Sequence, residues 1–84
     1  MEETFGFGRA LELLESGAKV ARVGWNGKKM WLYLVNDWSL VGADVPAHPL
    51  LPFIMMKTAD NKYVPWLASQ TDILAKDYTE VFNA

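Results

Sequence analysis

The chain has 84 residues and a formal net charge of −2, and 51% of its residues are hydrophobic. This length corresponds to one domain, which we expect to span residues 1–84. The absence of cysteine excludes disulfides, thiolate zinc sites and cysteine nucleophiles, and a single histidine argues against a metal site or a catalytic triad. The negative charge argues against DNA or RNA polymers as partners, and no apolar run is long enough to cross a membrane. We therefore expect a soluble, intracellular, tryptophan-rich binding domain rather than an enzyme.

The N-terminal third predicts a helix followed by a hairpin. Apolar residues recur at intervals of three and four from Phe7, which predicts a helix as far as Ser16, and Gly17 ends it. Residues 19–23 alternate between polar and apolar side chains and predict a short strand. Residues 30–35 predict a second strand that is apolar on both faces, as is typical of a central strand or a subunit contact. The Asn-Gly pair between the two strands favours a hairpin turn.

The middle of the chain predicts a loop and two further strands. Residues 36–52 contain three prolines and one glycine without a sustained period, so we expect an ordered loop there. Strands are predicted at 53–57 and 62–64, and Pro65 ends the second of them. In the turn that joins these strands, Asn61 tolerates a left-handed backbone in place of glycine.

The C-terminal segment predicts a short helix and a last strand. The Ser-Gln-Thr-Asp run at 69–72 fits a capping box, in which a serine and an acid three positions later cap a helix start. We expect the helix to reach about Lys76, with Ile73 and Leu74 directed inward, and a last strand at 79–82. The fold class is therefore α+β, a small antiparallel sheet with an N-terminal helix and a short C-terminal helix. The aromatic residues that we assign to the core are Phe7, Phe53, Tyr63 and Phe82.

A basic turn at residues 22–29 is the first candidate binding site. Its two glycines let backbone N–H groups approach a phosphate, and Arg22, Lys28 and Lys29 supply positive charge. Trp25 offers a ring on which a purine can stack. On spacing alone, a hairpin turn with solvated lysines and a tryptophan in the core is the stronger interpretation, and the glycine spacing does not fit a P-loop.

The start of the second predicted helix is the other candidate. Trp66 precedes it, and the unpaired N–H groups of a helix start favour anions. The alternative is that the polar residues only cap the helix while Trp66 lies in the core. No general base stands near Ser69 in the sequence and no paired carboxylates are found, so the sequence gives no support to catalysis. The side chains that can contact a sugar, a phosphate or a base amine here are Ser69, Gln70, Thr71 and Asp72.

These motifs together resemble a known family. The Gly-Ala-Lys-Val-Ala-Arg run at 17–22, the Gly-Trp-Asn-Gly-Lys turn at 24–28 and the Met-Lys-Thr-Ala-Asp run at 56–60 occur in one order. Val-Pro-Trp at 64–66 and Ser-Gln-Thr-Asp at 69–72 complete the pattern. The chain resembles the DUF2829 domain, the family of the second Thoeris anti-defence protein of phages. Lys29 and Asn61 stand where this family usually has glycine.

The resemblance implies a function as a sponge in the cytoplasm of a bacterial host. Such a protein sequesters a cyclic ADP-ribose isomer, made as an immune signal by a TIR-domain enzyme, and does not degrade it. It implies a homo-oligomer, typically a tetramer built as a dimer of dimers. From the residues themselves we expect no cofactor, metal, nucleic-acid polymer or membrane as partner. Alternatives that stay open are a sponge for cyclic oligonucleotide signals and a protein-interaction module that uses Trp31, Tyr33 and Trp38.

Carried over residue by residue, the resemblance implies a ligand pocket formed by the two tryptophan-containing segments of two subunits. One of the tryptophans would stack on adenine, the turn and the helix start would hold phosphates, and Asp72 would take ribose hydroxyls. The expected ligand-binding residues are Trp25, Asn26, Gly27, Lys28, Trp66, Ser69, Gln70, Thr71 and Asp72.

Overall fold

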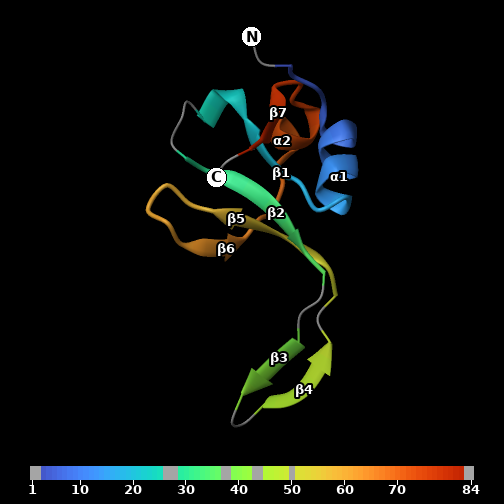
Figure 1. Cartoon of the computed structure of the whole chain (residues 1–84), viewed down its shortest axis with the longest axis vertical. Coiled ribbons are helices and arrows are strands. Elements are labelled where there is room, and N and C mark those ends of the chain that lie inside the picture. Colours follow the sequence, from blue (N-terminus) through green and yellow to red (C-terminus); the bar gives the residue numbers. More distant parts are fainter. Residues whose placement is uncertain (1–2, 26–28, 37–38, 43–44, 50, 83–84) are drawn as a thin grey trace.

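Five strands form an antiparallel sheet in the order β6-β5-β2-β1-β7, and one helix lies against it (Figure 1). The computed structural model describes residues 3–25, 29–36, 39–42, 45–49 and 51–82. Helix α1 (Phe7–Glu15) packs against β1, β2 and β7 and also contacts α2 (Gln70–Leu74). The α+β class with two helices is thus confirmed. The strands of this sheet are β1 (Lys19–Arg22), β2 (Trp31–Val35), β5 (Phe53–Lys57), β6 (Tyr63–Pro65) and β7 (Tyr78–Val81).

Helix α1 forms where the apolar spacing predicts it, within one residue at its C-terminal end. Ala10 and Leu14 lie one turn apart on its inner face and are 0% and 1% exposed. The N–H and hydroxyl groups of Ser16 donate to carbonyls of the last turn. Gly17 follows with φ 95°, a left-handed conformation that costs glycine little and turns the chain toward β1.

The buried core lies between α1 and the centre of the sheet. The two α1 residues contact Val20 of β1 and Leu32 of β2, which face each other across the antiparallel pair and are both 0% exposed. The ring of Tyr78, at the start of β7, completes this cluster and is also fully buried. Of the two alternatives given for the second strand, a central strand or a subunit contact, the central position is confirmed, because β2 has β1 on one side and β5 on the other.

The segment expected as a loop contains a second, two-stranded sheet, so that expectation is wrong. Strands β3 (Ser39–Gly42) and β4 (Val45–Pro49) pair with each other and project as an arm beyond the ends of β2 and β5 (Figure 1). Proline usually argues against a strand because it cannot donate to a ladder. Each strand of the arm has a single neighbour in the sheet, so prolines at 46 and 49 are tolerated there.

Two of the aromatic residues assigned to the core are exposed instead. Tyr63 belongs to the edge strand β6 and is 63% exposed, and Phe82 follows the end of β7 and is 70% exposed. The last strand begins one residue earlier than predicted, which makes Tyr78 the buried aromatic residue of this segment. The inward direction predicted for Ile73 and Leu74 is also wrong, since they are 47% and 71% exposed.

Two turns adopt left-handed backbone conformations without glycine. Asn61, between β5 and β6, has φ 64°, as predicted from its short polar side chain. Lys29, before β2, has φ 59°. Its carbonyl accepts a 2.8 Å hydrogen bond from Nζ of Lys57. Both positions are those at which the resemblance implies glycine, and the backbone supplies the physical reason.

Candidate functional site

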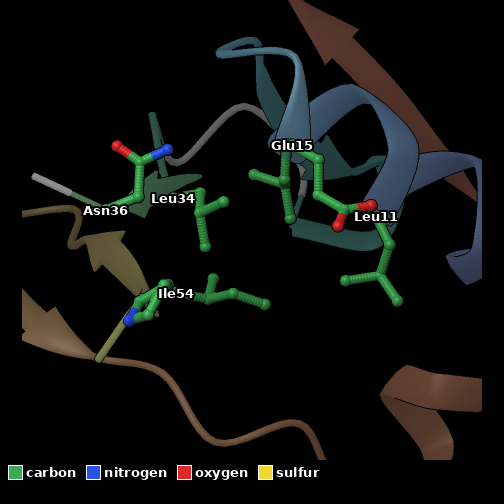
Figure 2. Close-up of a pocket in the computed structure, with 7 residues that line it drawn as sticks. Leu11, Glu15, Leu34, Asn36 and Ile54 are labelled. Atoms are coloured by element: carbon green, nitrogen blue, oxygen red, sulfur yellow. The ribbon is translucent and has the colours of Figure 1, made fainter.

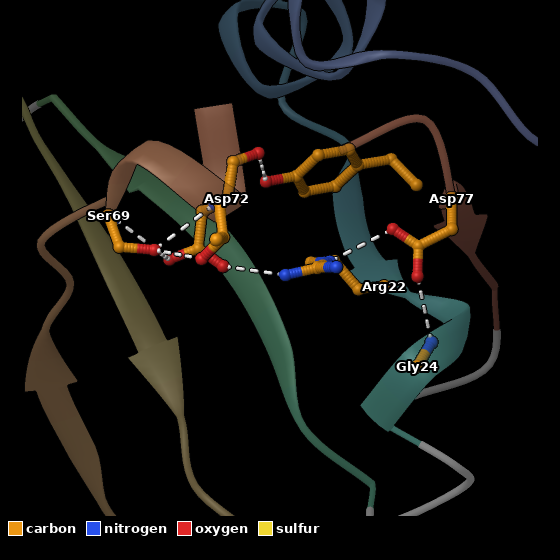
Figure 3. Close-up of polar contacts among 7 residues, drawn as sticks. Arg22, Gly24, Ser69, Asp72 and Asp77 are labelled. Atoms are coloured by element: carbon orange, nitrogen blue, oxygen red, sulfur yellow. Dashed lines mark hydrogen bonds and ion pairs between the residues drawn. The ribbon is translucent and has the colours of Figure 1, made fainter. Parts of the chain in front are cut away.

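A guanidinium group stands between two carboxylates where β1 ends (Figure 3). Nη1 of Arg22 lies 2.9 Å from Oδ1 of Asp72, and Nε lies 2.9 Å from Oδ1 of Asp77. The side chains of Arg22, Asp72 and Asp77 are 23%, 17% and 33% exposed, so water screens these ion pairs less than pairs at the surface. One strand is therefore joined to two segments that lie 50 and 55 residues further along the chain.

The second oxygen of Asp77 fixes the turn that follows β1. It accepts a 3.0 Å hydrogen bond from the backbone N–H of Gly24, which belongs to the short 3-10 helix η1 (Val23–Trp25). The N–H of Val23 donates to the backbone carbonyl of Asp77 at 2.8 Å. Two hydrogen bonds thus attach η1, which ends at Trp25, to Asp77, the residue that precedes β7.

The second oxygen of Asp72 fixes the start of α2. It accepts from the N–H of Ser69 at 2.9 Å and from its hydroxyl at 2.8 Å, and the same hydroxyl accepts from the N–H of Asp72. This is the predicted capping box, which is confirmed. The hydroxyl of Tyr78 donates a 2.6 Å hydrogen bond to the backbone carbonyl of Asp72, so a residue of the buried core also holds the first turn of α2.

These contacts change the acidity of the groups that make them. Burial raises the pKa of Asp72, but hydrogen bonds from Ser69 and Arg22 outweigh it and the net pKa is lowered. The pKa of Asp77 is lowered in the same way, because bonds from Arg22 and the Gly24 N–H outweigh burial. The bond to Asp77 raises the pKa of Arg22 against the effect of burial. Burial and the charge of Asp72 raise the pKa of Tyr78 to about 12.

Both tryptophans expected to bind ligand pack in part against the core. Trp25 and Trp66 are half-buried and contact the buried cluster, and the ring centroid of Trp66 lies 6.3 Å from that of Phe7. The interpretation as core residues is therefore correct for the buried part of each indole ring, and the other part is exposed to solvent. Asn26, Gly27 and Lys28 lie outside the described residues.

The expected residues at the start of α2 have hydrogen bonds of their own. Ser69, Gln70 and Thr71 are exposed, but the capping box uses the N–H groups of Ser69 and Asp72. Arg22 and Ser69 each contact one oxygen of Asp72. A carboxylate has about four lone-pair positions, and three are used by Nη1 of Arg22 and by the N–H and hydroxyl of Ser69, so about one remains for a further hydrogen bond.

The sequence reasoning missed Asp77 and Tyr78 and counted Arg22 among the charges of a basic turn. The structure pairs Arg22 with two carboxylates, so within the described residues this end of the turn carries no excess of positive charge. No local pattern could have identified these partners, because the contacts join residues far apart in sequence.

A separate pocket of about 380 Å³ lies between α1 and the ends of β2 and β5 (Figure 2). Glu15 lines this pocket and is the last residue of α1, where the helix dipole is negative. This pocket is thus poorly suited to phosphates and contains none of the expected ligand-binding residues. Its walls include Leu11, Leu14, Glu15, Leu34, Asn36 and Ile54.

Neither a metal cluster nor a membrane-spanning helix is found in the part of the chain that the structure describes. No group of three His, Asp or Glu side chains among these residues is placed to hold a metal ion. No helix among them has the length and apolar character needed to cross a bilayer.

The fold and the polar cluster define a small α+β domain in which a turn and a helix start are joined through one arginine. Residues 5–81 match the model of the Thoeris anti-defense 2-like domain. The chain is 41% identical over 85 residues to Thoeris anti-defense 2 of Bacillus phage SP01, a match that covers 93% of this chain and 96% of that protein. The chain therefore belongs to the Thoeris anti-defense 2-like family, and this membership gives it an anti-defence role.

Proposed function

We propose that the protein is a phage anti-defence sponge, which binds a cyclic ADP-ribose isomer made as the Thoeris immune signal and holds it without chemical change. The proposal extends the anti-defence role of the family to a ligand and a mechanism. It assigns the protein to the host cytoplasm, with no nucleic-acid polymer or membrane as partner. A sponge removes signal in proportion to the number of its sites, so it needs slow release rather than turnover.

The observation that carries the proposal is the connection of the two expected binding segments through one guanidinium. Arg22 reaches Asp72 of the capping box and Asp77, whose other oxygen holds Gly24 beside Trp25. Two segments that are far apart in sequence thus belong to one polar cluster. A fixed arrangement of this kind lowers the ordering cost of binding and so favours tight, slow-releasing complexes.

The chemistry of the signal matches the residues that we assign to it. The exposed part of Trp25 or Trp66 would stack on the adenine. The pyrophosphate would be bound by backbone N–H groups of residues 26–28 and of the Ser69–Thr71 segment, together with the Lys28 side chain. Asp72 would accept from ribose hydroxyls. In the capping region, the N–H groups of Gln70 and Thr71 have no acceptor among the described residues, so they would be the donors to a phosphate oxygen.

We further propose that the pocket forms between subunits of a homotetramer. A segment that runs from β6 through α2 exposes large apolar side chains to solvent in the single chain, including Leu67 at 92%. Burial of such side chains favours association. The residues concerned are Tyr63, Val64, Leu67, Ile73 and Leu74. Native mass spectrometry, with and without signal, gives the subunit number and the ligand stoichiometry.

Release of bound ligand by heat tests the proposal. The protein is incubated with the cyclic ADP-ribose isomer, passed through a desalting column and heat-denatured, and the supernatant is analysed by mass spectrometry. We expect intact signal in an amount close to the number of sites. No recovered signal would contradict the sponge, and recovered fragments would indicate an enzyme.

A matched pair of tryptophan variants connects the result to the site. Trp25→Leu is expected to lose retention of the signal. Trp31→Leu removes the same kind of side chain from β2, where it contacts Tyr63 and Lys19, and is expected to retain it. A protein-interaction module would retain no signal in the wild type or in either variant, and selective retention of cyclic oligonucleotides would indicate the alternative class of signal.

A further inference from the structure

We propose that Arg22 is a positioning residue, which sets the distance between η1 (Val23–Trp25), called here the Trp25 turn, and the start of α2. Through this distance it determines how fast the signal binds. This inference rests on the proposed function and adds a residue that does not itself touch the ligand. Three segments meet at this side chain: the end of β1, the residue before β7 and the first turn of α2.

The geometry of the contacts requires a guanidinium. Nε and Nη1 of Arg22 point to different carboxylates, each at 2.9 Å (Figure 3). A planar group with several fixed N–H directions can hold two acceptors at a set separation, whereas an ammonium is a single point charge on a flexible stem. Arginine is therefore expected to fix the two segments where lysine would leave them loosely joined.

Each carboxylate passes this constraint on to the backbone beyond it. Asp77 holds the N–H of Gly24, one residue before Trp25. Asp72 holds the N–H of Ser69, where the exposed polar segment begins. Movement of Arg22 would thus loosen both carboxylates, and with them the turn and the helix start, so the orientation of one segment relative to the other would be less fixed.

Charge balance indicates that Arg22 acts through its neighbours rather than by attracting the ligand. Its positive charge is opposed by the negative charges of Asp72 and Asp77 within hydrogen-bond distance. A pyrophosphate near this cluster would meet a net charge of −1. If electrostatic attraction were the role of the cluster, removal of a carboxylate would strengthen binding of an anion.

The test compares Arg22→Lys and Asp77→Ala with Glu80→Ala. This control removes a carboxylate from β7, three residues after Asp77. Association and dissociation rates of the cyclic ADP-ribose isomer are measured by stopped-flow tryptophan fluorescence, at a temperature where every variant is folded. We expect Arg22→Lys and Asp77→Ala to lower the association rate about tenfold, with little change in dissociation. Loss of a prearranged state reduces the fraction of molecules able to bind, whereas loss of a direct contact speeds release.

Three kinetic results would overturn the inference. These are stronger binding by Asp77→Ala, faster release with unchanged association in Arg22→Lys, and an equal loss in Glu80→Ala. The double variant Arg22→Lys with Asp77→Ala is expected to bind as weakly as the weaker of the two single variants, because both substitutions break the same bridge. Additive losses would likewise contradict a shared role.

Hydrogen exchange separates failure of this inference from failure of the proposed function. If the wild type binds no signal, the sponge is excluded, and the bridge is judged in the unliganded protein. Arg22→Lys is then expected to speed amide exchange at Gly24 and at Ser69 together, relative to Glu80→Ala. Faster exchange at one of these amides only, or at neither, would show that Arg22 does not join the two segments.

Discussion

The hydroxyl of Tyr78 donates a 2.6 Å hydrogen bond to the backbone carbonyl of Asp72, which fixes α2 to the buried core. The Tyr78 ring is fully buried, and its centroid lies 5.7 Å from that of the Phe7 ring. Tyr78→Phe keeps the ring and removes only the donor. We expect it to lower the free energy of unfolding by about 1 kcal/mol, measured by urea denaturation. Tyr33→Phe, on the half-buried face of β2, is the control, and an equal effect there would contradict a specific role for Tyr78.

Alkaline pH is expected to destabilise the fold through the same side chain. The pKa of Tyr78 is raised to about 12, above its value of about 10 in the unfolded chain. The folded state therefore holds this proton more tightly, so the stabilisation is complete below about pH 10 and is lost as the pH rises toward 12. Urea titrations across this range should show a steeper decline for the wild type than for Tyr78→Phe. Parallel declines would argue against this origin.

Acid is expected to weaken the cluster around Arg22. The pKa values of Asp72 and Asp77 are lower in the folded chain than in the unfolded chain, so the folded state binds protons less readily. Their stabilisation is present above the unfolded value of about 4 and is lost as the pH falls below it. The double variant Asp72→Asn with Asp77→Asn should show a flatter dependence of stability on pH below about 4. An unchanged dependence would mean that other carboxylates determine acid unfolding.

Glycine at position 29 is expected to stabilise the protein. Lys29 adopts φ 59°, a conformation that costs a residue with a Cβ about 1 kcal/mol or more. Lys29→Gly removes this strain, whereas Lys29→Ala removes the same side chain and keeps it. We therefore expect the glycine variant to exceed the alanine variant by about 1 kcal/mol in free energy of unfolding. Equal stabilities would show that the turn relaxes without glycine.

The β3–β4 arm is expected to be dispensable for folding of the five-stranded sheet. Val35 and Phe53 are directly paired at the ends of β2 and β5, so a short turn could join these strands without the arm. Replacement of residues 37–51 by such a turn should preserve the circular dichroism spectrum and cooperative unfolding. Loss of cooperative unfolding would show that the arm contributes to the core. Signal retention and subunit number in this variant would show whether the arm serves binding or assembly.

Much of the fold follows from patterns within a few residues. The period of α1, the alternation in β1, the apolar run of β2 and the capping box of α2 each depend on neighbours in the chain, and each is confirmed. The arm was missed because its prolines argue against a strand, although a strand with a single partner tolerates them. The exposure of Leu74 and Phe82 was missed because apolar character alone does not determine which residues the core can cover.

The length, the two tryptophan segments and the small negative charge already defined a small domain with few candidate sites. The resemblance to the family also came from motifs that are runs of adjacent residues, and the family match over residues 5–81 confirms it. Only the tertiary structure decided that Arg22 bridges Asp72 and Asp77 instead of adding charge to a basic turn. The reason is physical: an ion pair depends on distance in space, and the folded sheet brings together residues that lie 50 and 55 positions apart in the chain.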